Sequence, residues 1–219
     1  CDFFHLDREL DWARGFPVLN SGSNSIRLRN RLRQGIIMRL KDKVAIVTGA
    51  GTFKKDFTSV DQVGNGTACA LTFAREGALV VCTDRSLEAA EVAARLVQDE
   101  GGRDIPMAMD GTASKQVDAV VAEVVSMHRR VDILHNNVGI EIQGELVDVK
   151  DEDWDKVMDI NLRGAMAAAR AVMPIMRAQK SGSIINVSST ASLKWSPMQF
   201  LSYSTSKAGL NHMTRVIAR

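Results

Sequence analysis

Short apolar runs alternate with longer stretches of helical periodicity from residue 38 onward. The apolar runs predict five strands, at residues 43–48, 78–83, 105–109, 131–135 and 183–187. The remaining stretches predict helices at residues 65–76, 87–98, 114–127, about 151–180 and 202–217. Apolar strands that alternate with helices are typical of a parallel sheet covered on both faces. The pattern therefore predicts an α/β fold, a Rossmann-type doubly wound parallel sheet in a three-layer α/β/α arrangement.

Polar and glycine residues follow these strands where the strands end. They are Thr48-Gly49, Asp84, Asp110, Asn136-Asn137 and Ser188-Ser189. In a doubly wound sheet, ligands bind outside the carboxyl ends of the strands. The repeated placement of such residues predicts one ligand site along this edge of the sheet.

The composition adds few constraints of its own. A chain of 219 residues is long enough for one domain with a substantial core, and its net charge of +2 gives no reason to expect a nucleic-acid partner. No apolar run reaches the roughly 20 residues that a membrane-spanning helix needs. Three scattered cysteines indicate a reducing compartment, and we expect a cytoplasmic protein. The four histidines lack metal-ligand spacing, so no metal site is expected.

The first 37 residues show no clear period and mix acidic residues with the arginines of residues 27–33. The acidic residues argue against a targeting presequence, and no compact apolar segment is present. We interpret residues 1–37 as a disordered leader, or as translated sequence upstream of a start at Met38. Residues 38–219 are assigned to one domain with the fold predicted above.

The first strand leads into Thr48-Gly49-Ala50-Gly51, and a helix opens near Val63-Gly64-Asn65-Gly66. Glycines in these two segments let a backbone approach a pyrophosphate at the helix N-terminus. Asp84 ends the second strand, near the offset expected for a carboxylate that binds an adenosine ribose. A carboxylate there accepts from the 2′-hydroxyl and repels a 2′-phosphate, which favours NAD. Arg85 is able to meet a phosphate, so NADP stays open, and an alternative role for Asp84 is to cap the next helix.

Tyr203, the only tyrosine, lies four residues before Lys207, so the two side chains share one helical face. A nearby ammonium favours the ionised form of a phenol, which suits a general acid/base acting on an alcohol or ketone. The alternative is an ordinary surface pair. Ser189 follows the fifth strand, 14 residues before Tyr203, and its alternative role is to cap a turn.

Together these residues resemble the short-chain dehydrogenases/reductases of the compact, single-domain type, over residues 38–219. Gly49, Gly51, Val63 and Gly64 resemble a split T-G-x-x-x-G-x-G loop. The segment Asn136-Asn137-Val138-Gly139 matches N-N-A-G with valine for alanine. Asn161, Ser189, Tyr203 and Lys207 match the four catalytic residues of that family.

The resemblance implies an NAD(P)-dependent oxidoreductase that interconverts a secondary alcohol and a ketone. Tyr203 would exchange the proton with help from Lys207, Ser189 would hold the substrate oxygen, and Asn161 would hold a water. The cofactor would be bound by Gly49, Gly51, Val63, Gly64, Asp84, Asp110, Asn137, Gly139, Tyr203 and Lys207. Asp110 would contact the adenine ring. The implied partners are a small alcohol or ketone and further copies of the chain, in a dimer or tetramer.

Three features depart from the family pattern. Eleven residues, 52–62, separate Gly51 from Val63 where the family has two. The chain ends 12 residues after Lys207, so the last strands of the family's sheet are missing and we expect poor stability. The spacing between Ser189 and Tyr203 is one residue longer than usual. The first two departures favour an alternative, a non-catalytic or inactive protein of the same fold.

Overall fold

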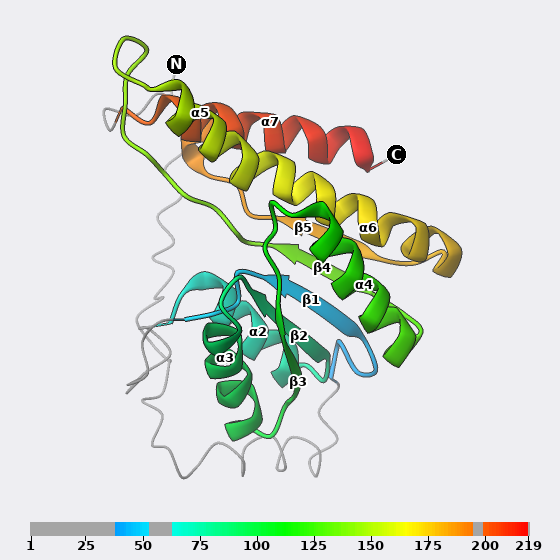
Figure 1. Ribbon diagram of the computed structural model, residues 1–219. Coiled ribbons are helices and arrows are strands. Elements are labelled where there is room, and N and C mark those ends of the chain that lie inside the picture. The colour runs from blue at the N-terminus through cyan, green and yellow to red at the C-terminus, as the bar shows by residue number, and fades with distance from the viewer. Residues whose placement is uncertain (1–37, 53–62, 195–198, 219) are drawn as a thin grey trace, which may run out of the picture.

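The computed structural model describes residues 38–52, 63–194 and 199–218. The leader predicted at residues 1–37 and all but Thr52 of the insert at 52–62 lie outside them. Five parallel strands form one sheet in the order β3-β2-β1-β4-β5 (Figure 1). They are β1 Val44–Thr48, β2 Leu79–Asp84, β3 Arg103–Ala108, β4 Ile133–Asn136 and β5 Ser183–Asn186. The predicted parallel α/β sheet is confirmed, with strand boundaries within two residues of those expected.

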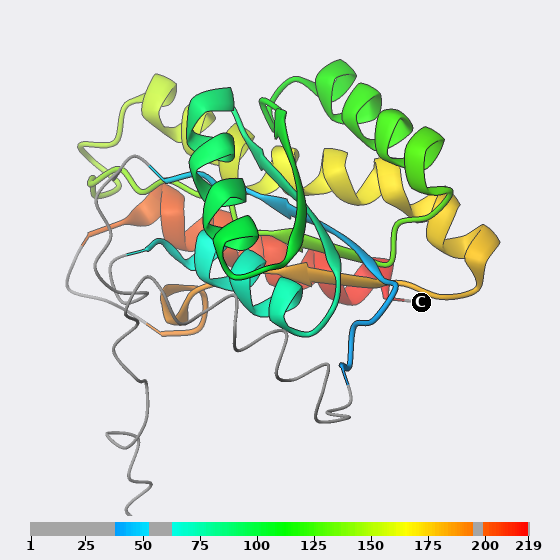
Figure 2. The same ribbon diagram turned by 90° about the horizontal axis from the view of Figure 1, so that it is seen from below.

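The helices are α2 Asn65–Arg75, α3 Leu87–Asp99, α4 Ser114–His128, α5 Asp151–Met158, α6 Gly164–Gln179 and α7 Leu201–Ile217. One helix was expected at about 151–180. A π-helical turn, Asp159–Arg163, instead joins α5 to α6 within this segment. Figure 2 shows the sheet between its covering helices, which gives the expected three layers.

Two hydrophobic cores lie on opposite faces of the sheet because successive strand residues point to opposite sides. Ile46, Val81 and Leu134 pack with residues of α4 and α6 in one core. Val47 and Val80 pack with residues of α2 and α3 in the other. Since both faces are buried, each strand reads as an uninterrupted apolar run, and this is why the strands could be found from the sequence.

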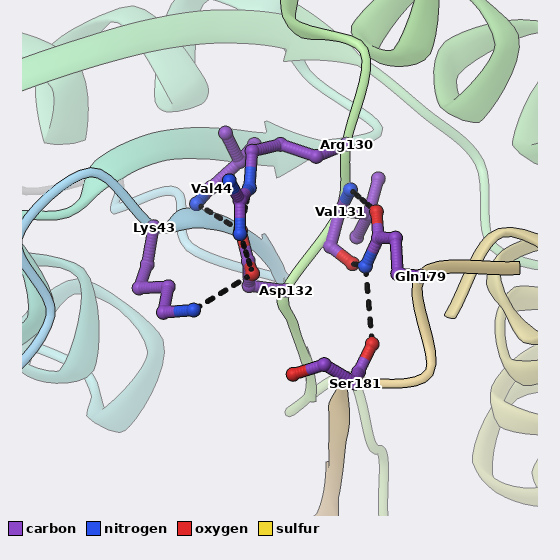
Figure 3. Close-up of polar contacts among 7 residues, drawn as sticks. All are labelled: Lys43, Val44, Arg130, Val131, Asp132, Gln179 and Ser181. Atoms are coloured by element: carbon purple, nitrogen blue, oxygen red, sulfur yellow. Dashed lines mark hydrogen bonds and ion pairs between the residues drawn. The ribbon is translucent and has the colours of Figure 1, made fainter. Parts of the chain in front are cut away.

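The amino-terminal edge of the sheet is held by a buried carboxylate (Figure 3). Asp132 is 4% exposed and accepts hydrogen bonds from the Val44 N–H at 3.0 Å and from Lys43 at 3.3 Å. Arg130 donates to both of its oxygens, at 2.7 and 2.6 Å. Burial alone would raise the pKa of Asp132, but the hydrogen bonds from Arg130, Val44 and Lys43 outweigh it and lower that pKa. These contacts fix the starts of β1 and β4 relative to one another.

The opposite, carboxyl-terminal edge carries the topological switch point. From β1 the chain proceeds through α2 to β2 on one side, and it later returns from β3 through α4 to β4 on the other side. The chain therefore diverges between the ends of β1 and β4, where Thr48 lies opposite Asn136. In doubly wound sheets such a divergence leaves a crevice in which ligands bind. We therefore expect the ligand site at this edge of the sheet.

Candidate active site

A cavity of about 640 Å³ opens at the carboxyl ends of β1 to β4. Its walls come from the loops after these strands and from α5, the π-helical turn and α6. The lining includes five of the predicted cofactor-binding residues, namely Gly49, Asp84, Asp110, Asn137 and Gly139. Four of the five strand ends predicted to converge thus share one cavity, and the fifth, Ser188-Ser189, does not line it. Ser189, Tyr203 and Lys207 are not part of its lining.

The turn after β1 is fastened to the turn after β4. The Asn137 N–H donates to the Thr48 hydroxyl at 3.1 Å, and the Asn137 side-chain amide donates to the Gly49 carbonyl oxygen at 3.0 Å. Gly49 has a φ of 62°, which favours glycine, and a Cβ atom there would lie 2.9 Å from the Val138 side chain. Two separate loops therefore form one rigid floor for the cavity.

Gly66, which was not among the predicted site residues, makes the closest approach in this turn. A Cβ atom at position 66 would collide with the Gly49 carbonyl oxygen and lie 2.7 Å from the Asn137 amide nitrogen. At Gly64, the expected close-approach glycine, a Cβ atom would meet nothing within 4 Å. Gly64 instead precedes the first turn of α2. The signal that was overlooked is the pair Gly64-x-Gly66, which fits the end of the T-G-x-x-x-G-x-G pattern better than Val63-Gly64 does.

Asp84 lies against the glycine turn. A Cβ atom at Gly51 would be 2.7 Å from the Asp84 carboxylate, so glycine is needed there for this approach. One Asp84 oxygen accepts from the Ser86 N–H at 3.1 Å. Ser86, not Asp84, caps α3, because its hydroxyl accepts from the Ala89 N–H at 3.3 Å. The alternative role of Asp84 as the helix cap is therefore wrong.

Asp110 forms a tight turn with Thr112. One carboxylate oxygen accepts from the Thr112 hydroxyl at 2.7 Å and from the Thr112 N–H at 2.9 Å. These hydrogen bonds, helped by the charge of Arg85, lower the pKa of Asp110. Asp110 is therefore a fixed negative charge on the cavity wall and also the residue that shapes the loop after β3.

Asn161 lies inside the π-helical turn and is 1% exposed. Its side-chain oxygen accepts from the Ile140 N–H at 2.8 Å, and its amide donates to the Ile140 carbonyl oxygen at 2.8 Å. The same amide donates to the Ser206 hydroxyl on α7 at 3.0 Å. The side chain thus connects the loop after β4 to the helix that carries Tyr203 and Lys207, and it is not an exposed polar residue in mid-helix.

Lys207 is 3% exposed, and its ammonium donates to the Val187 carbonyl oxygen at 2.7 Å. It lies 5.7 Å from the centroid of the Tyr203 ring, within the range of a cation–π contact. Among the described residues, no ion pair includes Lys207, and burial lowers the pKa of its ammonium. A Cβ atom at Gly139 would lie 3.2 Å from the Lys207 nitrogen. Gly139 therefore brings the cavity and the Tyr203–Lys207 pair together.

Ser189 follows β5, and its hydroxyl oxygen accepts from the Ala191 N–H at 3.2 Å. It thus caps the short helical turn Thr190–Ser192, which was its alternative role. Because this contact uses the oxygen as an acceptor, the hydroxyl hydrogen is left to donate elsewhere. Ser189 is therefore able to cap this turn and to donate a hydrogen bond to a ligand at the same time.

Residues 43–219 match the family model described as short chain dehydrogenase. This chain belongs to the short-chain dehydrogenase family. The match covers every strand and helix described above.

Curated and solved members of the short-chain dehydrogenase family resemble the chain closely. It is 37% identical to a 3-oxoacyl-[acyl-carrier-protein] reductase of Thermotoga maritima, over 83% of this chain and 69% of that protein. It is 33% identical to an NAD-dependent glycerol dehydrogenase of Listeria innocua, over 82% of this chain and 65% of that protein. A metagenomic short-chain oxidoreductase, solved in complex with NADP, is 33% identical with a TM-score of 0.72 and covers 82% of this chain and 76% of its own. The chain thus spans about two thirds of the length of the two curated relatives.

Two further findings concern the described part of this short-chain dehydrogenase. Its histidine, cysteine and acidic side chains form no group of three or more that is arranged to hold a metal ion. No helix there has both the length and the apolar character needed to cross a membrane.

Proposed function

We propose that this chain is an NAD(P)-dependent oxidoreductase that interconverts a secondary alcohol and a ketone on a small molecule. The observation that best supports the proposal is the placement of Lys207, a buried ammonium beside the ring of the only tyrosine. Burying a charge without an opposite charge is costly, and such groups concentrate at functional sites. Family membership supports the same reading.

In this proposal, the nicotinamide of the bound cofactor supplies or accepts the hydride. During reduction the Tyr203 hydroxyl gives its proton to the carbonyl oxygen of the substrate, and Lys207 stabilises the phenolate that remains. Ser189 donates its hydroxyl hydrogen to the same oxygen, where negative charge develops. Asn161 acts by binding Ile140, which follows Gly139, and Ser206, which precedes Lys207, and by holding a water that links Lys207 to solvent.

The cavity takes the adenosine half of the cofactor. Asp84, fixed by the Ser86 N–H beside Gly51, accepts from the 2′-hydroxyl of the ribose and repels a 2′-phosphate. We therefore propose NAD as the preferred cofactor. Gly49 and Gly66 let the backbone approach the pyrophosphate, which lies at the N-terminus of α2.

Cofactor titration followed by fluorescence tests the proposal. We expect saturable binding of NADH in the micromolar range. Binding of NADPH should be about tenfold weaker, a difference of ~1.4 kcal/mol, because its 2′-phosphate and the Asp84 carboxylate are both negative. In Asp84→Ser this preference should shrink. No saturable signal for either nucleotide at millimolar concentration would refute the proposal, and a preference for NADPH would refute the choice of NAD alone.

A second experiment tests the catalytic roles. Substrates for a first panel are a 3-oxoacyl carrier-protein thioester and glycerol, which correspond to the names of two relatives. Tyr203→Phe should bind NADH as the wild type does but turn over at least about 100-fold more slowly. Equal turnover by Tyr203→Phe would exclude Tyr203 as the acid/base.

The alternative function is that of a non-catalytic or inactive protein with the same fold. The long separation of Gly51 from Val63 favours it, because an insertion at the phosphate turn is able to displace backbone donors. At one end of this segment, the Thr52 N–H donates to the Ala89 carbonyl oxygen at 3.4 Å, which keeps that end on α3. Nucleotide binding without turnover of any substrate would support this alternative.

The proposal also covers the oligomeric state of the chain and its cellular compartment. We propose a homodimer or homotetramer, as the family resemblance implies, and light scattering of the purified protein tests it. Free Cys69 and Cys82 support a reducing compartment such as the cytoplasm.

A further inference from the structure

The adenosine side of the cavity and the catalytic asparagine belong to different elements. The loop after β3 supplies Asp110, Gly111 and Thr112 to the cavity wall. Asn161 lies in the π-helical turn between α5 and α6, with its side chain bonded to Ile140 and Ser206. Coupling between the two halves of the site requires a physical connection between this loop and this turn.

Arg163 provides one connection. Its guanidinium donates from Nε and Nη2 to the two oxygens of Asp159, at 2.7 and 2.6 Å. The remaining nitrogen, Nη1, donates to the Thr112 carbonyl oxygen at 3.4 Å. The bidentate fork orients the guanidinium on Asp159, and its third nitrogen then reaches the loop after β3 from a half-exposed position.

The Arg163–Asp159 pair encloses the same turn that carries Asn161. The Gly164 N–H donates to the Asp159 carbonyl oxygen, the contact from residue i to i−5 that makes this turn π-helical. The backbone and side chain of Asp159 therefore both hold the turn. A shift of Arg163 would act on the turn at both of its ends.

Gly164 provides a second, independent connection. A Cβ atom at position 164 would lie 3.2 Å from the Gly111 carbonyl oxygen, so the start of α6 lies directly against the loop after β3. Both glycines line the cavity. A molecule in the cavity therefore meets the loop and the start of α6 together.

The loop after β3 is built around a residue that lines the cavity. Asp110 binds Thr112 through its hydroxyl and its N–H, and Thr112 is the residue whose carbonyl receives Arg163. A ligand that contacts Asp110 therefore lies two residues from the Arg163 contact. Asp110, Thr112, Arg163 and Asp159 thus form a continuous series of hydrogen bonds from the cavity wall to the π-helical turn.

We propose that Arg163 is a positioning residue that couples occupancy of the adenosine side of the cavity to the π-helical turn holding Asn161. The proposal rests on the function proposed above, in which that cavity takes the adenosine half of NAD(P). Cofactor binding orders the loop after β3, and Arg163 transfers this ordering to the turn. The catalytic asparagine is thereby held most firmly when cofactor is present.

The chain contains a matched pair without these connections. Arg95 and Glu91 in α3 have the same spacing of four residues, but they are joined by a single 3.5 Å contact away from the cavity. Pairs of this kind are ordinary features of helix surfaces. Arg95→Met therefore controls for the loss of an exposed arginine from a helix.

Amide hydrogen exchange with ADP as the probe tests the proposal without needing a substrate. In the wild type, saturating ADP should slow exchange in residues 109–113 and in residues 159–164, each by at least about threefold. Arg163→Met should bind ADP within about threefold of the wild-type Kd and keep the first effect but lose the second. Arg163→Lys retains the charge but not the bidentate geometry, so it should show only part of the slowing in residues 159–164. Arg95→Met should show both effects in full.

The outcomes separate this proposal from the one on which it rests. If ADP slows residues 109–113 but not 159–164 in the wild type, or if Arg163→Met keeps both effects, the coupling role is wrong while the cofactor site stands. If the wild type does not bind ADP, both proposals fail. Asp159→Asn is the second variant, to be used if Arg163→Met does not fold. It removes the ion pair with little change in side-chain size, and ADP should no longer slow exchange in residues 159–164.

Discussion

Gly66 lies directly against the carbonyl oxygen of Gly49, so closely that a Cβ atom at position 66 would collide with it. The same Cβ atom would lie 2.7 Å from the Asn137 amide, which donates to that oxygen. One contact thus joins the start of α2, the turn after β1 and the loop after β4. These are the parts of the cavity floor that the proposed function assigns to the pyrophosphate.

Gly66→Ala should therefore lower both stability and nucleotide binding. The turn must shift to admit the methyl group, and overpacking of this kind costs about 1–3 kcal/mol. We expect a similar loss in the free energy of unfolding, measured with urea, and at least a tenfold rise in the Kd for NADH. Gly64→Ala is the comparison for stability, because a Cβ atom there meets no protein atom within 4 Å, and it should lower the free energy of unfolding less than Gly66→Ala does. Equal effects at the two positions would contradict this account.

The contrast between these two glycines shows what the sequence could and could not predict. The strands were predictable because both faces of each are buried, so that composition alone marks them. Gly66 was left out of the predicted cofactor-binding residues because the segment 52–62 obscures the spacing of the glycine motif. Only the fold shows that Gly49 and Gly66 lie together. Asn161 was proposed by resemblance, but its contacts with Ile140 and Ser206 could not be predicted, because those residues lie far away in the sequence.

Lys207→Met should weaken function without a large effect on stability. Removing the ammonium relieves the cost of burying a charge, but it also leaves the Val187 carbonyl oxygen without its donor. Because these effects oppose one another, we expect the free energy of unfolding at pH 7 to change by no more than about 1 kcal/mol. NADH binding should weaken at least about tenfold. Lys115→Met, on the exposed side of α4, should alter neither.

The difference in stability between the wild type and Lys207→Met should depend on pH. Burial lowers the pKa of Lys207 in the folded state, so the folded protein bears a penalty below that value. The penalty is relieved as the pH rises toward the unfolded value of about 10.4. Urea unfolding at pH 7 and pH 9.5 should therefore show the wild type gaining stability relative to Lys207→Met as the pH rises. The opposite trend would mean that the buried ammonium stabilises the fold.

Asp132→Asn should destabilise the amino-terminal edge of the sheet. The carboxylate is buried and receives hydrogen bonds from Val44, Arg130 and Lys43, and an amide nitrogen cannot accept them. We expect a loss of about 2 kcal/mol in the free energy of unfolding at pH 7. Because the folded pKa of Asp132 is lowered, its contribution is present above the unfolded value of about 3.9 and disappears as the pH falls through the folded value. The difference between wild type and variant should therefore shrink below pH 4, while Glu91→Gln should cost little at any pH.

His135 should make the wild type sensitive to mild acid. This residue is 5% exposed, and its ring stands edge-on to Phe73 at 5.8 Å between centroids. Its Nδ1 has no hydrogen-bond partner among the residues that the structure describes. Burial lowers the pKa of this histidine, so the unfolded chain takes up a proton at a higher pH than the folded protein does. Stability should be fully present above the unfolded value of about 6.5 and should fall as the pH decreases below it.

His135→Leu removes this titration while filling a similar volume, so its free energy of unfolding at pH 7.5 should lie within about 1.5 kcal/mol of the wild type. Urea unfolding between pH 8 and pH 5 should show the wild type losing stability relative to the variant as the pH falls below 6.5. His212→Gln, which changes an exposed histidine on α7, should follow the wild type in this comparison. A wild type and a His135→Leu variant with parallel profiles would show that this histidine does not control the acid sensitivity of the fold.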